Sequence, residues 1–494
     1  MTRSKRSGTF TLSPGIEIYG ELLLAGAKTN LYLRDKGFFP THDIPNQCIV
    51  GVLHDLTKVT LINCVAPGRP SSRSRGVDSY HYANIFPHFV ALGDRHLRPD
   101  ERVIAAADFL IDDANILFCD CDAFGLLIDA GPFIQEVANA AVGHSVTTGP
   151  EPRIIYFTGK REVFAASTAL GTVSAFHAPV VNVREPGGGT LRSRIMVSIA
   201  FEEPVDFATA MFRVARITEY LGLLVGRPQN LIDIRVHMAS NDETPVMLKV
   251  YWSMPPKRGS SSGSQKPISF DILLDAIRHP QEFERVLERW IERQADWHDA
   301  RWRFFNSFSR QTSYDIDRLI GSANMFDILP KSAVPPEVPI GDDLKCAQST
   351  SRVLFRALPQ SDERNSVLGA LGRIGESNLK QKVRYRAEGL VAAVPEWFPD
   401  LTMVTNEAVN CRNHYVHGGP PRFDYNGNFA AVVFFTDTLE FVFGASDLID
   451  AGWDIRSWIV QGTTMSHPFG KYRANYSLAL ANLKALLPTA STPS

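Results

Sequence analysis

The 494-residue chain has few of the features that mark secreted, membrane or metal-binding proteins. Its six cysteines are scattered and contain no CxxC pair, which is typical of proteins in a reducing compartment. No window approaches the ~18 uninterrupted apolar residues of a membrane span, and the basic start, MTRSKRSGTFTLSPG, has no apolar run of signal-peptide length behind it. We therefore expect a soluble cytoplasmic protein with no membrane partner.

The chain also lacks an excess of charge of one sign. Its 51 basic and 53 acidic side chains give a formal charge of -2, so any contact with nucleic acid requires a local basic patch. Cys119-Asp120-Cys121 raises the possibility of a metal, but ILFCDCDAFGLL fits a strand followed by a turn better, and a structural zinc site usually has four ligands from recognisable pairs. We expect no metal and no cofactor.

Two kinds of periodicity divide the chain. The first ~250 residues hold short apolar runs broken by Gly and Asn, such as GIEIYGELLL and CIVGVLHDLTKVTLINC, which predict strands. Beyond PPKRGSSSGSQKP, which is either a flexible linker or a long hairpin loop, the apolar residues recur with a period of 3.6. The predicted class is α+β: a β-rich N-terminal region, either a sandwich or a barrel, followed by an all-α bundle.

This pattern and the chain length favour a division into three parts, because 494 residues are more than usually fold around a single hydrophobic core. We expect a β-rich domain over residues 1–185 and a smaller mixed α/β unit over residues 186–268, ending in a flexible loop. A helical bundle is expected over residues 269–494.

The segment CRNHYVHGG, at Cys411–Gly419, gathers polar groups at the end of a predicted helix over residues 401–417. At 100° per residue one stripe of this helix is suited to packing, and it holds Val404, Ala408, Cys411 and Tyr415. A second sector mixes valines with polar groups, which favours a face that meets another polypeptide, and it holds Val409, Arg412, Asn413, Val416 and His417. A plainer interpretation is that Arg412, His414 and His417 are cations favoured at a helix C-terminus.

RNHYVH in a helical C-terminal domain resembles the RNxxxH motif of HEPN domains, many of which are metal-independent endoribonucleases. The segments ANMFDILP and LGRIGESNLKQKVRYR are similar to the HEPN domain of the ApeA anti-phage family, and GELLLAGAKTNLYL and LGLLVGRPQNL are similar to its N-terminal domain. The resemblance implies a homodimer with a composite site and an N-terminal sensor or restraint. It also implies a role in anti-phage defence by abortive infection.

Metal-free RNA cleavage needs a proton acceptor, a proton donor and a cation beside the phosphate. His417 suits either proton role, Arg412 suits the phosphate, and Asn413 can hold the imidazole or a phosphate oxygen. The products would be a 2',3'-cyclic phosphate and a 5'-hydroxyl. His414 is an auxiliary phosphate contact or proton donor, or else only a solvent-facing residue.

The segment LKQKVRYR predicts a surface for RNA, with basic side chains around an aromatic ring that can stack on a base. Its candidate residues are Lys380, Lys382, Arg384, Tyr385 and Arg386. The alternative is an ordinary solvated helix face.

The function predicted from these features is an endoribonuclease effector of anti-phage defence, whose partners are RNA, a second copy of the chain and a phage-derived trigger protein. The alternatives are a non-catalytic HEPN module that binds nucleotide or RNA, and a bundle that only dimerises. The sequence identifies neither the RNA that is cleaved nor the activating signal.

Overall fold

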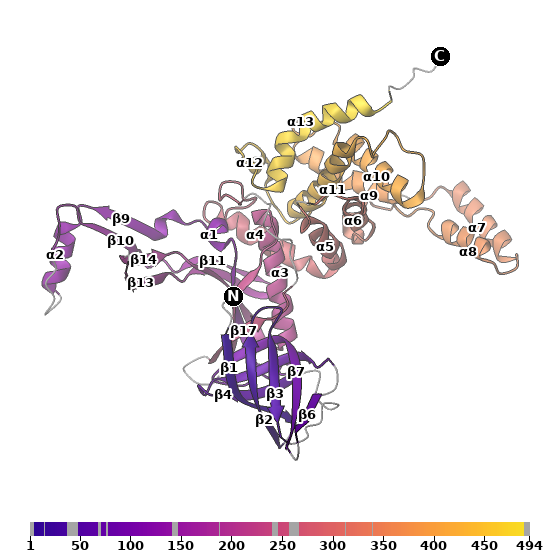
Figure 1. Cartoon of the computed structure of the whole chain (residues 1–494). Helices are drawn as coiled ribbons and strands as arrows, with labels where there is room; N and C mark the ends of the chain where they lie inside the picture. Colours follow the sequence, from indigo (N-terminus) through magenta and orange to yellow (C-terminus); the bar gives the residue numbers. More distant parts are fainter. Residues whose placement is uncertain are drawn as a thin grey trace. The chain divides into compact units, whose positions relative to one another are not determined.

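The computed structural model divides the chain into two compact units, the first rich in strands and the second built of helices (Figure 1). The first unit comprises Met1–Ser261 and Pro267–Glu292, and the second comprises Ser262–Lys266 and Arg293–Ser494. The residues that the structure describes are 4–13, 15–36, 48–67, 71–75, 78–140, 147–186, 188–239, 246–255, 266–311, 313–337 and 339–488. Most of PPKRGSSSGSQKP lies outside them.

A 13-stranded sheet organises the first unit, and six of its strands close into a barrel (Figure 1). The strands β7, β3, β2, β1, β4 and β5 are neighbours in that order, and β5 pairs again with β7 to complete the ring. Closure satisfies the strand edges that an open sheet would expose. The bounds are β1 Ser4–Ser13, β2 Ile16–Leu24, β3 Asn30–Asp35, β4 Cys48–Leu53, β5 Lys58–Val65 and β7 Asp78–Gly93.

Alternating side chains fill the interior of this barrel. In β2 the residues Ile18, Leu22 and Leu24 are buried and their neighbours face outward, as a period of two requires. Phe10 of β1 is completely buried, and a Cβ atom on Gly20 or Gly51 would lie only 3.0 or 2.7 Å from its ring. Glycine at these two positions therefore makes room for the aromatic ring.

Strand β7 belongs both to the barrel and to the rest of the sheet. Its residues 81–85 pair with β3, and its residues 89–92 pair on with β17. From β17 the sheet continues through β16, β8, β15 and β12 to β11, and β6 pairs with β7. The bounds are β6 Ser71–Arg75, β8 Ile104–Ile111, β11 Glu162–Thr168, β12 Gly171–His177, β15 Ile195–Val205, β16 Leu231–Met238 and β17 Val246–Trp252.

Two short ribbons and two short helices complete the strand-rich part. Strand β9 pairs with β10, and β13 pairs with β14, each as a separate two-stranded sheet. No described residue of α2 is buried. The bounds are α1 Ala114–Leu117, the 3-10 helix η1 Cys121–Ala123, β9 Phe124–Ile128, α2 Gly131–Ala140, β10 Arg153–Phe157, β13 Val180–Glu185 and β14 Gly188–Arg192.

Two longer helices belong to the first unit. Helix α3 (Phe207–Val225) begins at Asp206, whose side chain accepts a hydrogen bond from the backbone of Thr209, and contacts β8 and β15. Helix α4 (Pro280–Glu292) buries Phe283 and Trp290. The Phe283 ring lies 4.7 Å from that of Phe164 on β11, and the Trp290 ring lies 5.1 Å from that of Tyr220 on α3.

The two compact units differ from the three parts that we expected. The sheet joins strands from both sides of residue 185, so residues 1–185 and 186–268 share one structure. Helix α4 was expected in the bundle over residues 269–494, but its aromatic face packs in the first unit. The helical period predicted the helix correctly, but a period does not say which core the apolar face joins.

The second unit is a helical bundle with α11 among its most buried helices. An 18-residue window of α11 is long and apolar enough to cross a membrane, yet 78% of it is buried inside the protein, as expected for a core helix of the bundle. The bounds are α5 Gln294–Phe308, α6 Ile316–Asp327, η2 Lys331–Ala333, α7 Asp342–Arg356, α8 Asp362–Gly372, α9 Leu379–Ala393, α10 Leu401–His417, α11 Phe429–Asp450, α12 Ile455–Ile459 and α13 Pro468–Leu486. The predicted class, a β-rich region followed by a helical bundle, is confirmed.

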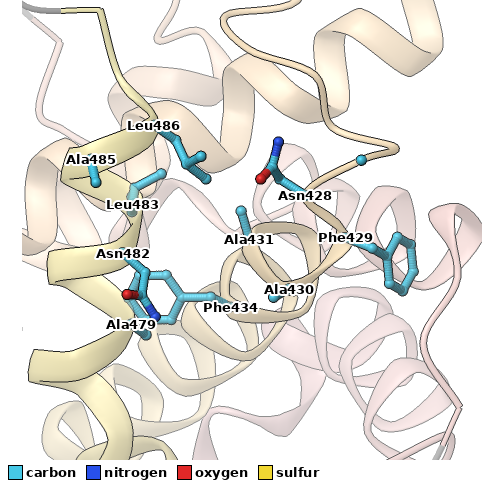
Figure 2. Close-up of a pocket in the computed structure, with 11 residues that line it drawn as sticks. Asn428, Phe429, Ala430, Ala431, Phe434, Ala479, Asn482, Leu483, Ala485 and Leu486 are labelled. Carbon is cyan, nitrogen blue, oxygen red and sulfur yellow. The ribbon is translucent and has the colours of Figure 1, made fainter.

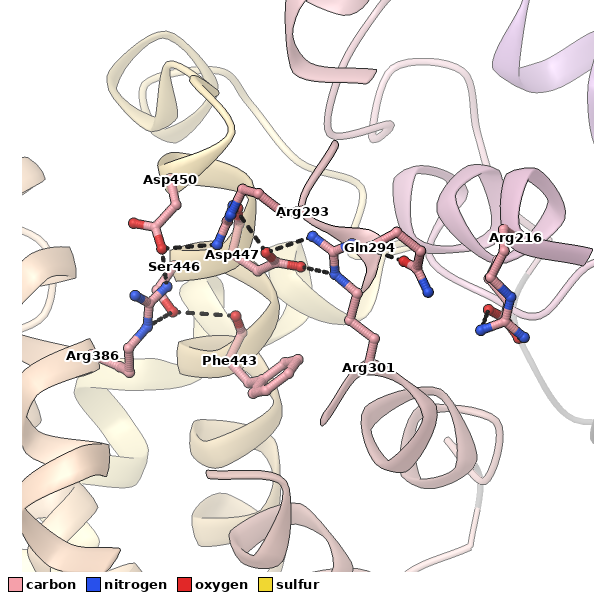
Figure 3. A network of polar contacts seen from close by, with 10 residues as sticks. Arg216, Arg293, Gln294, Arg301, Arg386, Phe443, Ser446, Asp447 and Asp450 are labelled. Carbon is pink, nitrogen blue, oxygen red and sulfur yellow. Dashed lines mark hydrogen bonds and ion pairs between the residues drawn. The ribbon is translucent and has the colours of Figure 1, made fainter. Parts of the chain in front are cut away.

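Buried ion pairs tie α5 and α6 to α11. The Arg301 guanidinium donates to both carboxylate oxygens of Asp447, at 2.8 and 2.9 Å (Figure 3). Arg318 of α6 makes the same paired contact with Glu440, at 2.9 and 2.8 Å. Burial alone would raise the pKa of Asp447, but the nearby arginines lower it below its ordinary value. These pairs fix the position of α6 in the bundle.

Candidate functional site

Helix α10 carries the RNHYVH segment, and its observed bounds, Leu401–His417, match the predicted ones. Its C-terminus is set by Gly418, which has a φ of 72° and whose backbone N–H donates to the carbonyl of His414. At the other end Asp400 makes no side-chain cap, and its carboxylate instead pairs with Lys484 at 2.6 Å. The left-handed turn at Gly418 therefore places His417 at the very end of the helix.

The packing stripe predicted for α10 is largely confirmed. Val404, Ala408 and Cys411 are buried, and burial together with the charge of Glu407 raises the pKa of the Cys411 thiol to about 12. Val409 departs from the prediction, because it is also buried. Helix α10 packs against α6, α9 and α11, so more of its circumference is covered than one stripe provides for.

The three motif side chains converge at the end of α10. The Nη1 atom of Arg412 donates to the side-chain oxygen of Asn413 at 3.0 Å and lies 3.3 Å from Nε2 of His417. Arg412 is mostly buried, whereas His417 is exposed. A guanidinium, an amide and an accessible imidazole therefore meet at one point of the surface.

Two residues from α6 complete this cluster and were not identified from the sequence. The Nη2 atom of Arg412 donates to the side-chain oxygen of Asn324 at 2.7 Å, and the Asp327 carboxylate lies 3.7 Å from the same atom. Asn324 and Asp327 are three residues apart, so they share one face of α6. Both lie in ANMFDILP, but only a tertiary contact shows that they face the arginine.

His414 points away from the motif cluster. Its Nδ1 atom lies 2.6 Å from the carbonyl oxygen of Gly419, and its ring packs 5.4 Å from that of Tyr425. Tyr415, on the packing stripe, is partly buried and donates to the side-chain oxygen of Asn426 at 3.1 Å. His414 therefore helps to fold the loop after α10, and this contact supports neither role considered for it from the sequence.

Four of the five basic-patch candidates on α9 reach the surface. Lys382 donates to the backbone carbonyl of Asp327 at 2.7 Å, which places it beside the carboxylate that faces Arg412. Lys380 lies 3.5 Å from the side chain of Asn410 on α10. Arg384 is exposed and pairs with Glu388, and Tyr385 is 37% exposed.

The fifth candidate, Arg386, does not belong to this surface. Its side chain is only 6% exposed and pairs with Asp450 at 2.7 Å, while its Nε group donates to Ser446 (Figure 3). The guanidinium also lies over the ring of Trp297, at 5.3 Å. Arg386 therefore holds α9 against α5 and α11 and is not available to RNA.

No group of three or more His, Cys, Asp or Glu residues within the described part of the chain is arranged to hold a metal ion. Cys119 and Cys121 are exposed, and the segment around them forms α1 and η1 before β9, not the expected strand and turn.

A separate cavity of about 440 Å³ lies in the bundle between the start of α11 and the last turns of α13 (Figure 2). Its walls are mostly apolar, with the amides of Asn428 and Asn482 among them. None of its lining residues belongs to the motif or to α6.

Comparisons with known families agree with the observed division of the chain. The model of ApeA N-terminal domain 1 matches residues 5–290, more than half of the chain. The model of the Apea-like HEPN domain matches residues 320–456, a range that contains Asn324, Asp327 and the α10 motif. No curated protein and no solved structure matched. The chain therefore belongs to the ApeA family, with an ApeA N-terminal domain followed by an Apea-like HEPN domain.

Proposed function

We propose that this protein is a metal-independent endoribonuclease effector of anti-phage defence, acting from the cytoplasm by abortive infection. The observation that carries the proposal is the convergence of Arg412, Asn413 and His417. These side chains supply the chemical groups that RNA cleavage without a metal requires. Membership of the ApeA family supports the role in defence.

In the proposed reaction the 2'-hydroxyl of RNA attacks the adjacent phosphorus while its proton passes to an imidazole. The bond from phosphorus to the 5'-oxygen breaks, and that oxygen takes a proton, leaving a 2',3'-cyclic phosphate and a 5'-hydroxyl. His417 is exposed and suits one proton transfer. The Arg412 guanidinium, 3.3 Å away, stabilises the charge on the phosphate, and Asn413 orients it.

A second proton-transfer group comes from a second copy of the chain in this proposal. One copy brings one His417, whereas acid and base roles call for two groups. Val416 beside it is 41% exposed, so the end of α10 offers both an apolar contact and polar chemistry to a partner. We therefore propose a homodimer through the HEPN bundle.

The basic side of α9 provides the path for the substrate. Lys382 meets the C-terminal end of α6 next to the motif cluster, and Lys380 lies beside α10. Arg384 and Tyr385 extend this surface along α9 with a charge and a ring. These four residues suit contact with phosphates and stacking on a base.

The N-terminal unit restrains the nuclease in this proposal, and a phage-derived protein relieves the restraint. An unrestrained ribonuclease would damage the RNA of its own cell. In the first unit the buried Asp113 carboxylate serves the fold, because Arg227 donates to both of its oxygens at 2.7 and 2.6 Å.

The test compares the wild-type protein with His417→Ala on total RNA in excess EDTA, with phage proteins added to relieve the proposed restraint. The variant is expected to cleave ~10²- to 10⁴-fold more slowly, because a general acid or base typically contributes that much. The ends of the products are read for cyclic phosphate and 5'-hydroxyl. His54→Ala, which removes an exposed histidine of the first unit, is the matched control and retains wild-type activity.

Each other result points to a different function. Equal cleavage by the wild type and His417→Ala would mean that the nuclease activity does not belong to this site. If the wild type retains RNA without cutting it, even with phage proteins added, the domain is a non-catalytic RNA-binding module. If it neither binds nor cuts RNA but dimerises, the bundle is an interaction module.

A further inference from the structure

The motif arginine is held from outside its own helix. The Nη1 atom of Arg412 is directed toward Asn413 and His417, and its Nη2 atom donates to the side-chain oxygen of Asn324 of α6 at 2.7 Å. Among the described residues its Nε atom has no hydrogen-bond partner. Among the described residues, the bond to Asn324 is therefore the shortest polar contact of the guanidinium, and it comes from a different helix.

Helix α6 is a firm support for this bond. Met325 and Phe326, which follow Asn324, are fully buried, and Arg318 on the same helix is locked to Glu440. Ser322 adds a further buried hydrogen bond to Glu440, at 3.1 Å. Because α6 cannot shift without breaking these contacts to α11, and α10 packs against both α6 and α11, Asn324 is held beside α10.

The neutral charge of this amide matters for a phosphate substrate. A carboxylate as close as 2.7 Å would cancel much of the positive charge of Arg412. The nearest acid, Asp327, stays at 3.7 Å and is 43% exposed, so water screens it. The amide thus orients the guanidinium and leaves its charge for the substrate.

We propose that Asn324 is a positioning residue that fixes the guanidinium of Arg412 for the phosphate of RNA. The inference rests on the proposed ribonuclease function. Without the acceptor at residue 324, the guanidinium of Arg412 turns toward the carboxylate of Asp327. Its Nη1 atom then loses its position beside Nε2 of His417. Asn324 acts only through Arg412 and touches no reacting atom.

Two variants of the full-length protein separate orientation from charge. Asn324→Leu keeps the size of the side chain but removes the acceptor, and kcat for RNA cleavage falls about ten- to hundredfold with a smaller change in KM. Asn324→Asp keeps the acceptor but adds a charge, so KM rises more than kcat falls. Asn475→Leu, an exposed position on α13, is the control and leaves both constants unchanged.

A double-mutant cycle tests whether Asn324 works through Arg412. In the Arg412→Ala background, Asn324→Leu has no further effect on the cleavage rate. A purely structural residue would lower the melting temperature in both backgrounds and leave the activity per folded molecule unchanged. That result, or equal losses in both backgrounds, would overturn the inference.

The same cycle is measured for binding of RNA that carries 2'-O-methyl groups and cannot be cleaved. If the wild type does not cut RNA, the ribonuclease proposal fails, while binding still reports on Asn324. Weaker binding by Asn324→Leu, lost in the Arg412→Ala background, supports the inference independently. Equal binding by all variants contradicts it.

Discussion

Asp437 is a residue of α11 whose protonation differs from that of an ordinary aspartate. Burial and the charge of Glu440 raise its pKa to about 7, against the hydrogen bond from Tyr314 and the charge of Arg318. The folded protein therefore keeps a proton on Asp437 over a range where the unfolded chain has lost it. The contribution of this raised pKa to the free energy of unfolding is fully present below pH 4 and is lost as the pH rises through 7.

We predict that Asp437→Asn removes this pH dependence. The amide keeps the oxygen that accepts from Tyr314 at 2.7 Å but carries no charge. At pH 8 the variant should be more stable than the wild type by up to about 4 kcal/mol, and near pH 4 the difference should vanish. Urea unfolding at several pH values measures this, and a constant difference would contradict it.

At the residue scale the sequence predicts which residues are candidates for the site better than it predicts which side chains they contact. Arg412, Asn413 and His417 were chosen by a local pattern, and the structure brings them together because one helix end carries all three. Arg386 looks like the other cations of α9 in the sequence, yet it is buried against Asp450. Asn324 gave no local signal, because its partner lies 88 residues away.

At the scale of elements, the end of α10 depends on one backbone conformation. Gly418 adopts a φ of 72°, which a residue with a Cβ atom adopts only with strain, whereas Gly419 is not in that region. The turn also brings the carbonyl of Gly419 to His414. The position of His417 therefore depends on this turn.

We predict that Gly418→Ala lowers the free energy of unfolding by about 1 kcal/mol and slows RNA cleavage, because the helix end that carries His417 is strained. Gly419→Ala is the matched control, since a Cβ atom there meets nothing within 4 Å. Thermal unfolding and cleavage assays on both variants measure the effect. Equal behaviour of the two would show that the turn does not position His417.

The basic side chains of α9 lie in different surroundings, because Lys380 and Arg384 are exposed whereas Arg386 is buried. We predict that Lys380→Ala and Arg384→Ala each weaken RNA binding and reduce the slope of log affinity against log salt by about 0.7, the value for one phosphate contact on a single strand. Arg386→Ala should instead lower stability, because the buried guanidinium that joins α9 to Ser446 and Asp450 of α11 is lost. Binding titrations from low to high salt, with thermal unfolding, distinguish the two outcomes.

The bounds of α10 were predictable because strong local signals mark its end: Gly418-Gly419 followed by two prolines. The faces of the same helix were less predictable. Val409 was placed on the outer sector by its angle, but three helices surround α10 and bury it. The angular position of a residue around a helix can be predicted from the sequence, whereas the number of helices that pack against that helix cannot.

At the scale of the whole molecule, the division of the chain follows the packing of α4. Its buried Phe283 and Trp290 contact rings of the first unit, so the helix belongs there despite its helical neighbours in the sequence. A cut before α4 would leave that apolar face without its core. A cut after Glu292 follows the boundary between the compact units.

We predict that a fragment of residues 293–494 is monodisperse and unfolds cooperatively. A fragment of residues 269–494 should aggregate, because it carries α4 with its aromatic face exposed. Size-exclusion chromatography and circular dichroism compare the two. Substituting Phe283 and Trp290 by serine in the longer fragment should restore solubility, and its failure to do so would count against this explanation.

The sequence leaves a sandwich and a barrel as alternatives for the strand-rich part, and no local signal identifies which strands close the ring. Alternation in GIEIYGELLL identifies a strand and its inner face, but the partners of β7 lie both early and late in the chain. Register between such distant strands depends on the whole hydrophobic pattern and not on any local signal. The strand-rich class was therefore predictable, while the ring of six strands was not.

The 16 residues of β7 have one further consequence. Since one continuous backbone pairs with β3 near its start and with β17 near its end, deleting a single residue from its middle would invert the inward and outward faces of one half relative to the other. The barrel and the rest of the sheet both depend on the length of β7. A residue inserted into or deleted from this strand during evolution would therefore require a compensating change in the strands that pair with it on both sides.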